Sequence, residues 1–200
     1  HSLVRVQPPQ PFRKPLIFNG FFDFRGNCMQ NIADEIYKKS ILLDNKSVSW
    51  ADVYYAVKEN FFPADIVKDY AFHTVETNSS DDVYEILVSE NPAEAFDMLE
   101  TQMRRQQQIN EKQRERSLRL IRFLVLKNIL NENSDALFEK AAIVYEDMGC
   151  PEDMDSFVYY MPNKDGYKPE KHTKKENKDR MLTFMKKFLD NEENALNLNQ

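Results

Sequence analysis

The residues that could support catalysis or metal binding are few and far apart in this 200-residue chain. His73 lies four residues after Asp69 and three before Glu76, so a helix would place the three side chains on one face, where they could hold a metal ion. The same spacing is typical of an ion-pair network on a helix surface, which is the interpretation we adopt. We therefore predict no metal and no cofactor.

Cys150 is the one cysteine in the part of the chain that we expect to fold. It follows a predicted helix end, where the helix dipole disfavours a thiolate, and no histidine is near it in sequence. No residue is therefore assigned a catalytic role, and a protein without enzymatic activity is favoured. A helical enzyme with a polar pocket near Trp50, Asp52 and His73 is kept as an alternative.

A dense group of carboxylates surrounds the turn at 149–151, and no lysine or arginine is interleaved with it. An aromatic corner follows over 156–167, where Pro162 stops a helix and Gly166 permits a turn. Such a surface is either solvated or binds a basic protein, and an exposed tyrosine beside it is typical of a binding hot spot. The predicted partner-binding residues are Glu146, Asp147, Glu152, Asp153, Asp155, Tyr159, Asp165 and Tyr167.

Basic residues gather between positions 104 and 122, a segment that is also predicted to be helical. They surround the helix axis, glutamates are interleaved with them, and no aromatic side chain is present to stack on bases. A regulator that binds nucleic acid through this segment is therefore an alternative that we do not favour. The residues are Arg104, Arg105, Lys112, Arg114, Arg116, Arg119 and Arg122.

The hydrophobic spacing predicts an all-α fold of eight or nine helices, arranged as an irregular bundle or a helical-repeat-like array. Ser49 is a good N-cap for a helix that starts at Trp50, and the run 91–94 combines the cap, proline and glutamate of a helix start. We expect two helices over 92–107 and 111–131, or one long bent helix, and another helix over 152–161. No alternating pattern typical of a strand is present.

The composition of the chain changes at Met29. The residues before it carry four basic side chains against one aspartate, contain four of the nine prolines, and show no helix or strand period. We therefore expect a non-native or disordered leader over 1–28, a single all-α domain over 29–190 and a frayed polar tail over 191–200. A targeting peptide is the alternative for the leader, although it lacks a continuous apolar region and a small-residue cleavage site.

The composition of the whole chain is typical of a globular protein, with 42% hydrophobic and 30% charged residues. No apolar run approaches the roughly 18 residues of a membrane-spanning helix, so no membrane association is expected. Two cysteines do not make a disulfide framework, which favours a cytoplasmic location. The net charge of −6 disfavours nucleic acids and anionic membranes as partners, and it leaves the oligomeric state open.

Three groups of residues, in order along the chain, resemble a known family. They are Ser49 to Val57 followed by Phe61-Phe62-Pro63 and Tyr70-Ala71, then Val144 to Met154, and then the corner from Phe157 to Gly166. The set resembles the bacterial family called domain of unknown function 2247 over residues 45–190, with the polar run 104–116 excluded. Small helical families of this kind often occur beside polymorphic toxins as immunity proteins. The resemblance implies no mechanism by itself, but together with the acidic turn and the tyrosine corner it leads us to expect a protein that binds another protein, as an immunity-type inhibitor of a basic toxin domain.

Overall fold

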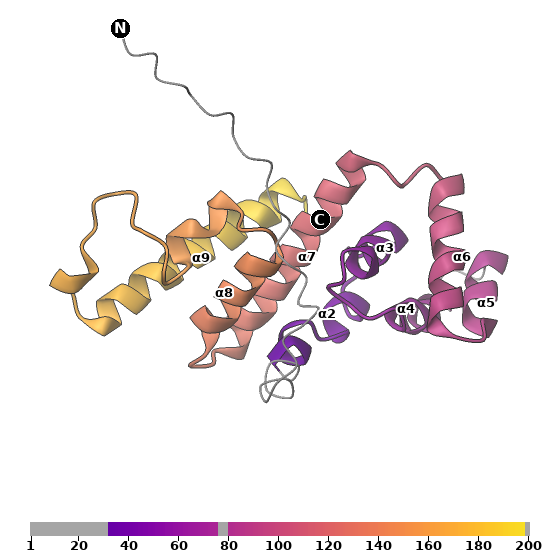
Figure 1. Cartoon of the computed structure of the whole chain (residues 1–200), viewed down its shortest axis with the longest axis horizontal. Coiled ribbons are helices and arrows are strands. Elements are labelled where there is room, and N and C mark those ends of the chain that lie inside the picture. The colour runs from indigo at the N-terminus through magenta and orange to yellow at the C-terminus, as the bar shows by residue number, and fades with distance from the viewer. Residues whose placement is uncertain (1–31, 76–79, 199–200) are drawn as a thin grey trace, which may run out of the picture.

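The computed structural model describes residues 32–75 and 80–198, so the predicted leader lies outside the described residues. Within these ranges the chain forms α-helices and short 3-10 helices and contains no strand, which confirms the all-α class. Residues 32–36 are helical, and eight α-helices, α2 to α9, follow them. Figure 1 shows the long helix α7 between one side formed by α8 and α9 and another side formed by α3 to α6.

The first helices are α2 (Ser40–Leu43), α3 (Trp50–Lys58) and α4 (Ile66–Thr74). As predicted, Ser49 precedes the first turn of α3, and its backbone N–H donates to Asp52 Oδ2 at 2.8 Å within a capping box. Residues 51–56 of α3 are buried without interruption, so this helix is enclosed by neighbours rather than half exposed. Helix α3 therefore belongs to the core, where it packs against the later helix α7 (Glu111–Glu132).

The helix pair α5 (Asp81–Val88) and α6 (Pro92–Arg105) packs beside α4 at the right-hand end of the molecule in Figure 1. The predicted start signal of α6 is confirmed, because Asn91 Oδ1 accepts a hydrogen bond from Glu94 N at 3.0 Å and Pro92 occupies the first turn. Proline at this position removes no hydrogen bond that the helix needs. The local sequence therefore determines where α6 begins.

The chain turns sharply between α6 and α7 (Glu111–Glu132), so two helices form here and not one bent helix. Gln107 adopts a left-handed backbone with φ of 56°, which an α-helix does not permit. Asn110 then caps α7 by accepting from Gln113 N at 2.9 Å. Helix α7 contacts α3, α8 and α9, and its buried residues span several faces, which makes it the central helix of the fold.

Helix α8 (Leu137–Asp147) runs beside α7 and ends before Gly149, whose φ of +79° gives the left-handed turn that often closes a helix. The next element, η1 (Glu152–Phe157), is a 3-10 helix. The prediction of a helix over 152–161 is therefore wrong in length and type. A 3-10 helix places residues three apart on one side, and this lets Met154 and Phe157 enter the core together with no exposed surface.

The last elements are η2 (Pro169–Lys171) and α9 (Lys174–Ala195), which packs on η1 and α7. Residues 191–195, expected to belong to a frayed tail, form the end of α9. Glu192 is only 6% exposed there and receives two hydrogen bonds from Arg119 of α7, at 3.1 and 2.8 Å. This bidentate ion pair fastens the end of α9 to the central helix.

Candidate functional site

The five carboxylates predicted around the 149–151 turn lie at the end of α8 and in η1. Glu146 and Asp147 are the last two residues of α8, whereas Glu152, Asp153 and Asp155 belong to η1. The left-handed backbone at 149 and 150 reverses the chain between these two elements. The turn therefore brings the two groups of acids to the same end of α8.

Although no lysine or arginine is interleaved with these carboxylates in sequence, two of them form salt bridges with cations from elsewhere in the chain. Arg122 of α7 holds Asp153 with hydrogen bonds of 3.0 and 2.7 Å. Lys164 holds Asp155 at 2.9 Å, and its hydrogen bond keeps the pKa of Asp155 below the ordinary value. Both cations lie outside the acidic run in sequence and reach it only in the folded chain.

None of the other three acids forms a salt bridge with a lysine or arginine within the described ranges, although Lys164 also interacts electrostatically with Glu152. The hydroxyl of Tyr160 donates to Glu146 at 2.8 Å, and that of Tyr37 donates to Asp147 at 2.9 Å. Glu152 is exposed at the start of η1. A tyrosine donor leaves the charge of the carboxylate in place, so this end of α8 keeps a negative surface.

Two tyrosines stand beside this surface. Tyr159 is 58% exposed and Tyr160 45% exposed, and their rings meet edge to face with centroids 5.2 Å apart. Sequence reasoning selected Tyr159 and missed Tyr160, because a helix over 152–161 would put Tyr160 on the buried face of Phe157. Since the chain is extended at Val158, both tyrosines instead leave the core together. We call Glu146, Tyr159 and Tyr160 the tyrosine–acid face.

The remaining two predicted site residues, Asp165 and Tyr167, lie at the end of the corner and hold it against α9. Asp165 accepts from Arg180 at 2.6 Å, and the Arg180 guanidinium lies over the rings of Tyr167 and Phe184 at 4.1 and 4.4 Å. The Tyr167 hydroxyl donates to Asn177 at 2.7 Å. Contacts within the chain therefore occupy both residues.

Asp52, named in the enzyme alternative, is fully buried and serves the fold. Besides its bond from Ser49, it accepts from the hydroxyl of Ser117 on α7 at 2.6 Å. Trp50 packs edge to face on Tyr70, with the ring centroids 4.7 Å apart. Burial raises the pKa of the Tyr70 hydroxyl to about 12. His73 is exposed, and Glu76 of the considered metal group lies outside the described residues. The geometry gives Asp52 the role of a link between α3 and α7.

The arginines of the 104–122 segment mostly pair with carboxylates of the protein itself. Arg119 and Arg122 face the α9 and η1 side, whereas Arg114 reaches back to the end of α3. A guanidinium that is already bound to a carboxylate is a poor contact for a phosphate. The ion pairs are Arg104 with Glu100, Arg114 with Glu59 and Glu111, Arg116 with Asp52, Arg119 with Glu192, and Arg122 with Asp153 and Glu192.

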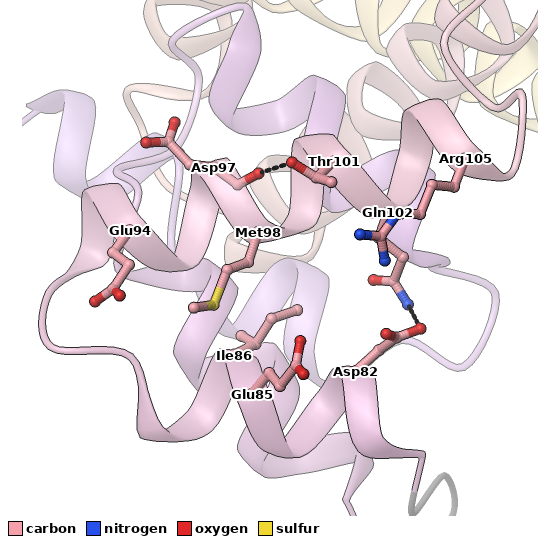
Figure 2. A pocket seen from close by; sticks show the side chains of 9 residues that line it. All are labelled: Asp82, Glu85, Ile86, Glu94, Asp97, Met98, Thr101, Gln102 and Arg105. Carbon is pink, nitrogen blue, oxygen red and sulfur yellow. Dashed lines mark hydrogen bonds between the residues drawn. The ribbon is translucent and has the colours of Figure 1, made fainter.

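A second acidic surface, which sequence reasoning missed, lies along a groove between α5 and α6 (Figure 2). Its lining includes Asp82, Glu85, Glu94 and Asp97 over an apolar floor. The signal was present in the sequence, because residues 80–103 contain seven aspartates and glutamates and no lysine or arginine. Only the antiparallel packing of the two helices turns that run into one surface.

The geometry defines an all-α protein with one helical core and two acidic surfaces, one where α8 meets η1 and one along the groove between α5 and α6. No group of three or more histidines, cysteines or carboxylates within 32–75 and 80–198 is arranged to hold a metal ion. In the same ranges no helix has the length and apolar character needed to cross a membrane.

The chain belongs to the family described as "Uncharacterized protein conserved in bacteria (DUF2247)", whose model matches residues 40–193. No curated protein and no solved structure matches the chain. The family match begins at the first residue of α2 and ends within α9. It therefore includes both acidic surfaces.

Proposed function

We propose that this protein acts by binding another protein, as an immunity-type inhibitor of a toxin domain that carries a basic surface. The observation that carries the proposal is the tyrosine–acid face, in which two exposed tyrosines are held edge to face and one is bonded to Glu146. Large aromatic side chains beside a charged group are characteristic of the residues that dominate binding energy in protein interfaces.

The tyrosines sit on a rigid base, which lowers the entropy cost of binding. Phe157, two residues before Tyr159, is fully buried and lies 5.4 Å from the ring of Phe188 on α9. Met161, just after the tyrosines, lies close to the hydroxyl of Tyr145. Because both flanks are anchored, the tyrosine rings are already ordered before a partner arrives.

The charge around the face favours a basic partner. Glu146, Asp147 and Glu152 form no salt bridge in the described structure, so they leave negative charge at this end of α8. Such a field speeds the encounter with a cationic surface and weakens as salt is added. A cytoplasmic site of action fits the exposed free thiol of Cys150, which is typical of a reducing compartment.

The test is to co-express the protein with the product of each gene adjacent to its own, and to measure both relief of growth arrest and association rates. Tyr159→Ala should weaken binding to the cognate product at least about tenfold, since it removes an interface anchor. Glu146→Lys should mainly slow association, whereas Glu139→Lys, an exposed site nearer the start of α8, is the matched control. The proposal is wrong if no adjacent product binds, or if both face variants bind as the wild type does.

A further inference from the structure

The segment 164–180, which contains η2 and the first turns of α9, is basic although the chain as a whole is acidic. It has seven lysines and arginines and four aspartates and glutamates, a net charge of +3 in a chain of −6. Lys168, Lys171 and Lys174 are exposed and form no salt bridge with any described residue. In Figure 1 the start of α9 and the loop before it form the left-hand end of the molecule, away from α5 and α6. A local positive surface therefore stands at this end.

Three of the four acids in this segment already serve contacts within the chain. Glu176 accepts from the backbone N–H and the hydroxyl of Thr173, at 2.7 and 2.8 Å, in the capping box of α9. The fourth acid, Glu170, is exposed and forms no hydrogen bond or salt bridge with a described residue. The other two are in ion pairs, Asp165 with Arg180 at 2.6 Å and Asp179 with Lys175 at 3.8 Å.

Two flat rings are stacked among these lysines. The rings of Tyr167 and His172 are nearly parallel, with an interplanar angle of 14° and centroids 4.5 Å apart. The guanidinium of Arg180 also lies over the Tyr167 ring, at 4.1 Å. The His172 side chain is 39% exposed, and its exposed part cannot be the face that Tyr167 covers. Another planar group can therefore extend the stack on His172.

Hydrogen bonds fix the stack and the lysines of η2 relative to α9. The Tyr167 hydroxyl donates to the side chain of Asn177 at 2.7 Å, and the amide of Asn177 donates to the carbonyl of Pro169 at 3.0 Å. The N–H of Lys171 donates to the carbonyl of Lys168 at 3.0 Å, which holds these two lysines within one 3-10 turn. The ring and the cations are thus ordered before a ligand arrives, which lowers the entropy cost of binding.

We propose that this end of the protein binds single-stranded nucleic acid, with a base stacked on His172 and phosphates beside Lys168, Lys171 and Lys174. Proteins that bind single strands combine cations that follow the backbone with flat side chains on which bases stack. The segment 104–122 has cations without an aromatic ring, whereas this surface has both. Phosphates and bases are common to RNA and DNA, so the surface should accept either. The inference does not depend on the proposed function.

The probe is a fluorescein-labelled strand of about 12 nucleotides, made both as oligo(dT) and as oligo(U). Fluorescence anisotropy with the full chain should give a Kd of about 10–100 μM at about 50 mM salt, because the acidic remainder of the chain limits the affinity. The two strands should bind within about threefold of each other. An abasic strand of the same length has the phosphates without the bases, and it should bind about tenfold more weakly.

Lysine variants test the contacts to phosphate. Lys171→Gln/Lys174→Gln should weaken oligo(dT) binding about tenfold and reduce its dependence on salt, because two phosphate contacts are lost. The matched control Lys46→Gln/Lys112→Gln removes two exposed lysines that also form no salt bridge, and it should leave the affinity within about twofold. Glu170→Gln should strengthen binding about twofold, because it removes the unpaired acid of η2.

Histidine variants test the stacking of a base. His172→Ala should weaken oligo(dT) binding about tenfold, whereas His172→Phe keeps a flat ring and should stay within about twofold of the wild type. His172→Ala should bind the abasic strand as the wild type does, since that strand has no base to stack. A loss confined to strands that carry bases separates stacking from a general change in structure.

Several results would overturn this assignment. They are no binding of oligo(dT), equal binding of the abasic strand, an unchanged affinity in His172→Ala, or equal weakening by the two lysine variants. Binding to vesicles of phosphatidylglycerol that oligo(dT) does not displace, and that Lys171→Gln/Lys174→Gln abolishes, would assign the surface to a membrane instead. Tyr159→Ala should leave oligo(dT) binding unchanged, so failure here and failure of the proposed function can be told apart.

Discussion

Asp52 shows how a single side chain can resemble a catalytic group in the sequence and serve the fold instead. It is fully buried, accepts from Ser49 within α3 and from Ser117 on α7, and lies 3.5 Å from the guanidinium of Arg116. A buried carboxylate satisfied by hydrogen bonds stabilises the positions of its donors. Its burial is therefore explained without a substrate.

Asp52→Ala should lower the free energy of unfolding by about 2 kcal/mol, since it removes the acceptor of the Ser49 N–H in the capping box of α3 and leaves the buried Ser117 hydroxyl without its acceptor. Urea unfolding followed by circular dichroism measures the change. The exposed His73 is the matched site, and His73→Ala should stay within about 0.5 kcal/mol of the wild type. Equal stability of the two variants would contradict the structural role of Asp52.

At the scale of elements, the turn between α8 and η1 determines how the acidic residues and tyrosines of these two elements are arranged. Gly149 and Cys150 both have positive φ, at 79° and 58°, and the N–H of Cys150 donates to the carbonyl of Tyr145 at 2.8 Å. This geometry satisfies a carbonyl at the end of α8 and reverses the chain. The tyrosine–acid face depends on it, because Glu146 lies before the reversal and Tyr160 after it.

Gly149→Ala should therefore destabilise the protein by about 1 kcal/mol, the usual cost of placing a Cβ in the left-handed region. No atom lies within 4 Å of the position that this Cβ would take, so steric overlap adds nothing. Gly149→Asn should cost less, since asparagine tolerates this backbone better. Thermal unfolding of the two variants shows which one loses more stability. Equal losses of stability would mean that backbone strain is not the cause.

For the whole molecule, ion pairs join segments that are far apart in sequence. The carboxylate of Glu132, at the end of α7, accepts hydrogen bonds from the ammonium groups of Lys38 at 2.5 Å and Lys140 at 2.9 Å. These hydrogen bonds lower the pKa of Glu132 to about 2. The carboxylate thus connects the first described segment, the central helix and α8. Its ordinary value of 4.5 applies once the chain unfolds.

Because the folded pKa of Glu132 is depressed, its contribution is fully present above pH 4.5 and is lost as the pH falls toward 2. Glu132→Gln should lower stability by about 2 kcal/mol near neutral pH, and the gap to the wild type should narrow across that acidic range. Denaturant unfolding at a series of pH values measures this difference in the free energy of unfolding. Glu139→Gln is the control, and a gap that does not depend on pH would contradict the assignment.

The sequence by itself determined the features that depend on neighbours along the chain. The capping residues Ser49 and Asn91, the proline that opens α6 and the glycine after α8 act within one helical turn, so their effect could be read from spacing alone. The all-α class and the family followed from the same local patterns. The local pattern did not predict that η1 is a 3-10 helix, because burial of Met154 and Phe157 overrode the α-helical signal.

Only the tertiary structure decided which charges remain available to a partner. Arg122 reaches Asp153 across 31 positions of sequence, and Arg119 reaches Glu192 across 73, so the charge run alone could not show that these acids are neutralised. Conversely, Asp82, Glu85, Glu94 and Asp97 line one groove only because α5 and α6 pack side by side. Ion pairing and groove formation depend on distances in space, and packing of the core sets those distances.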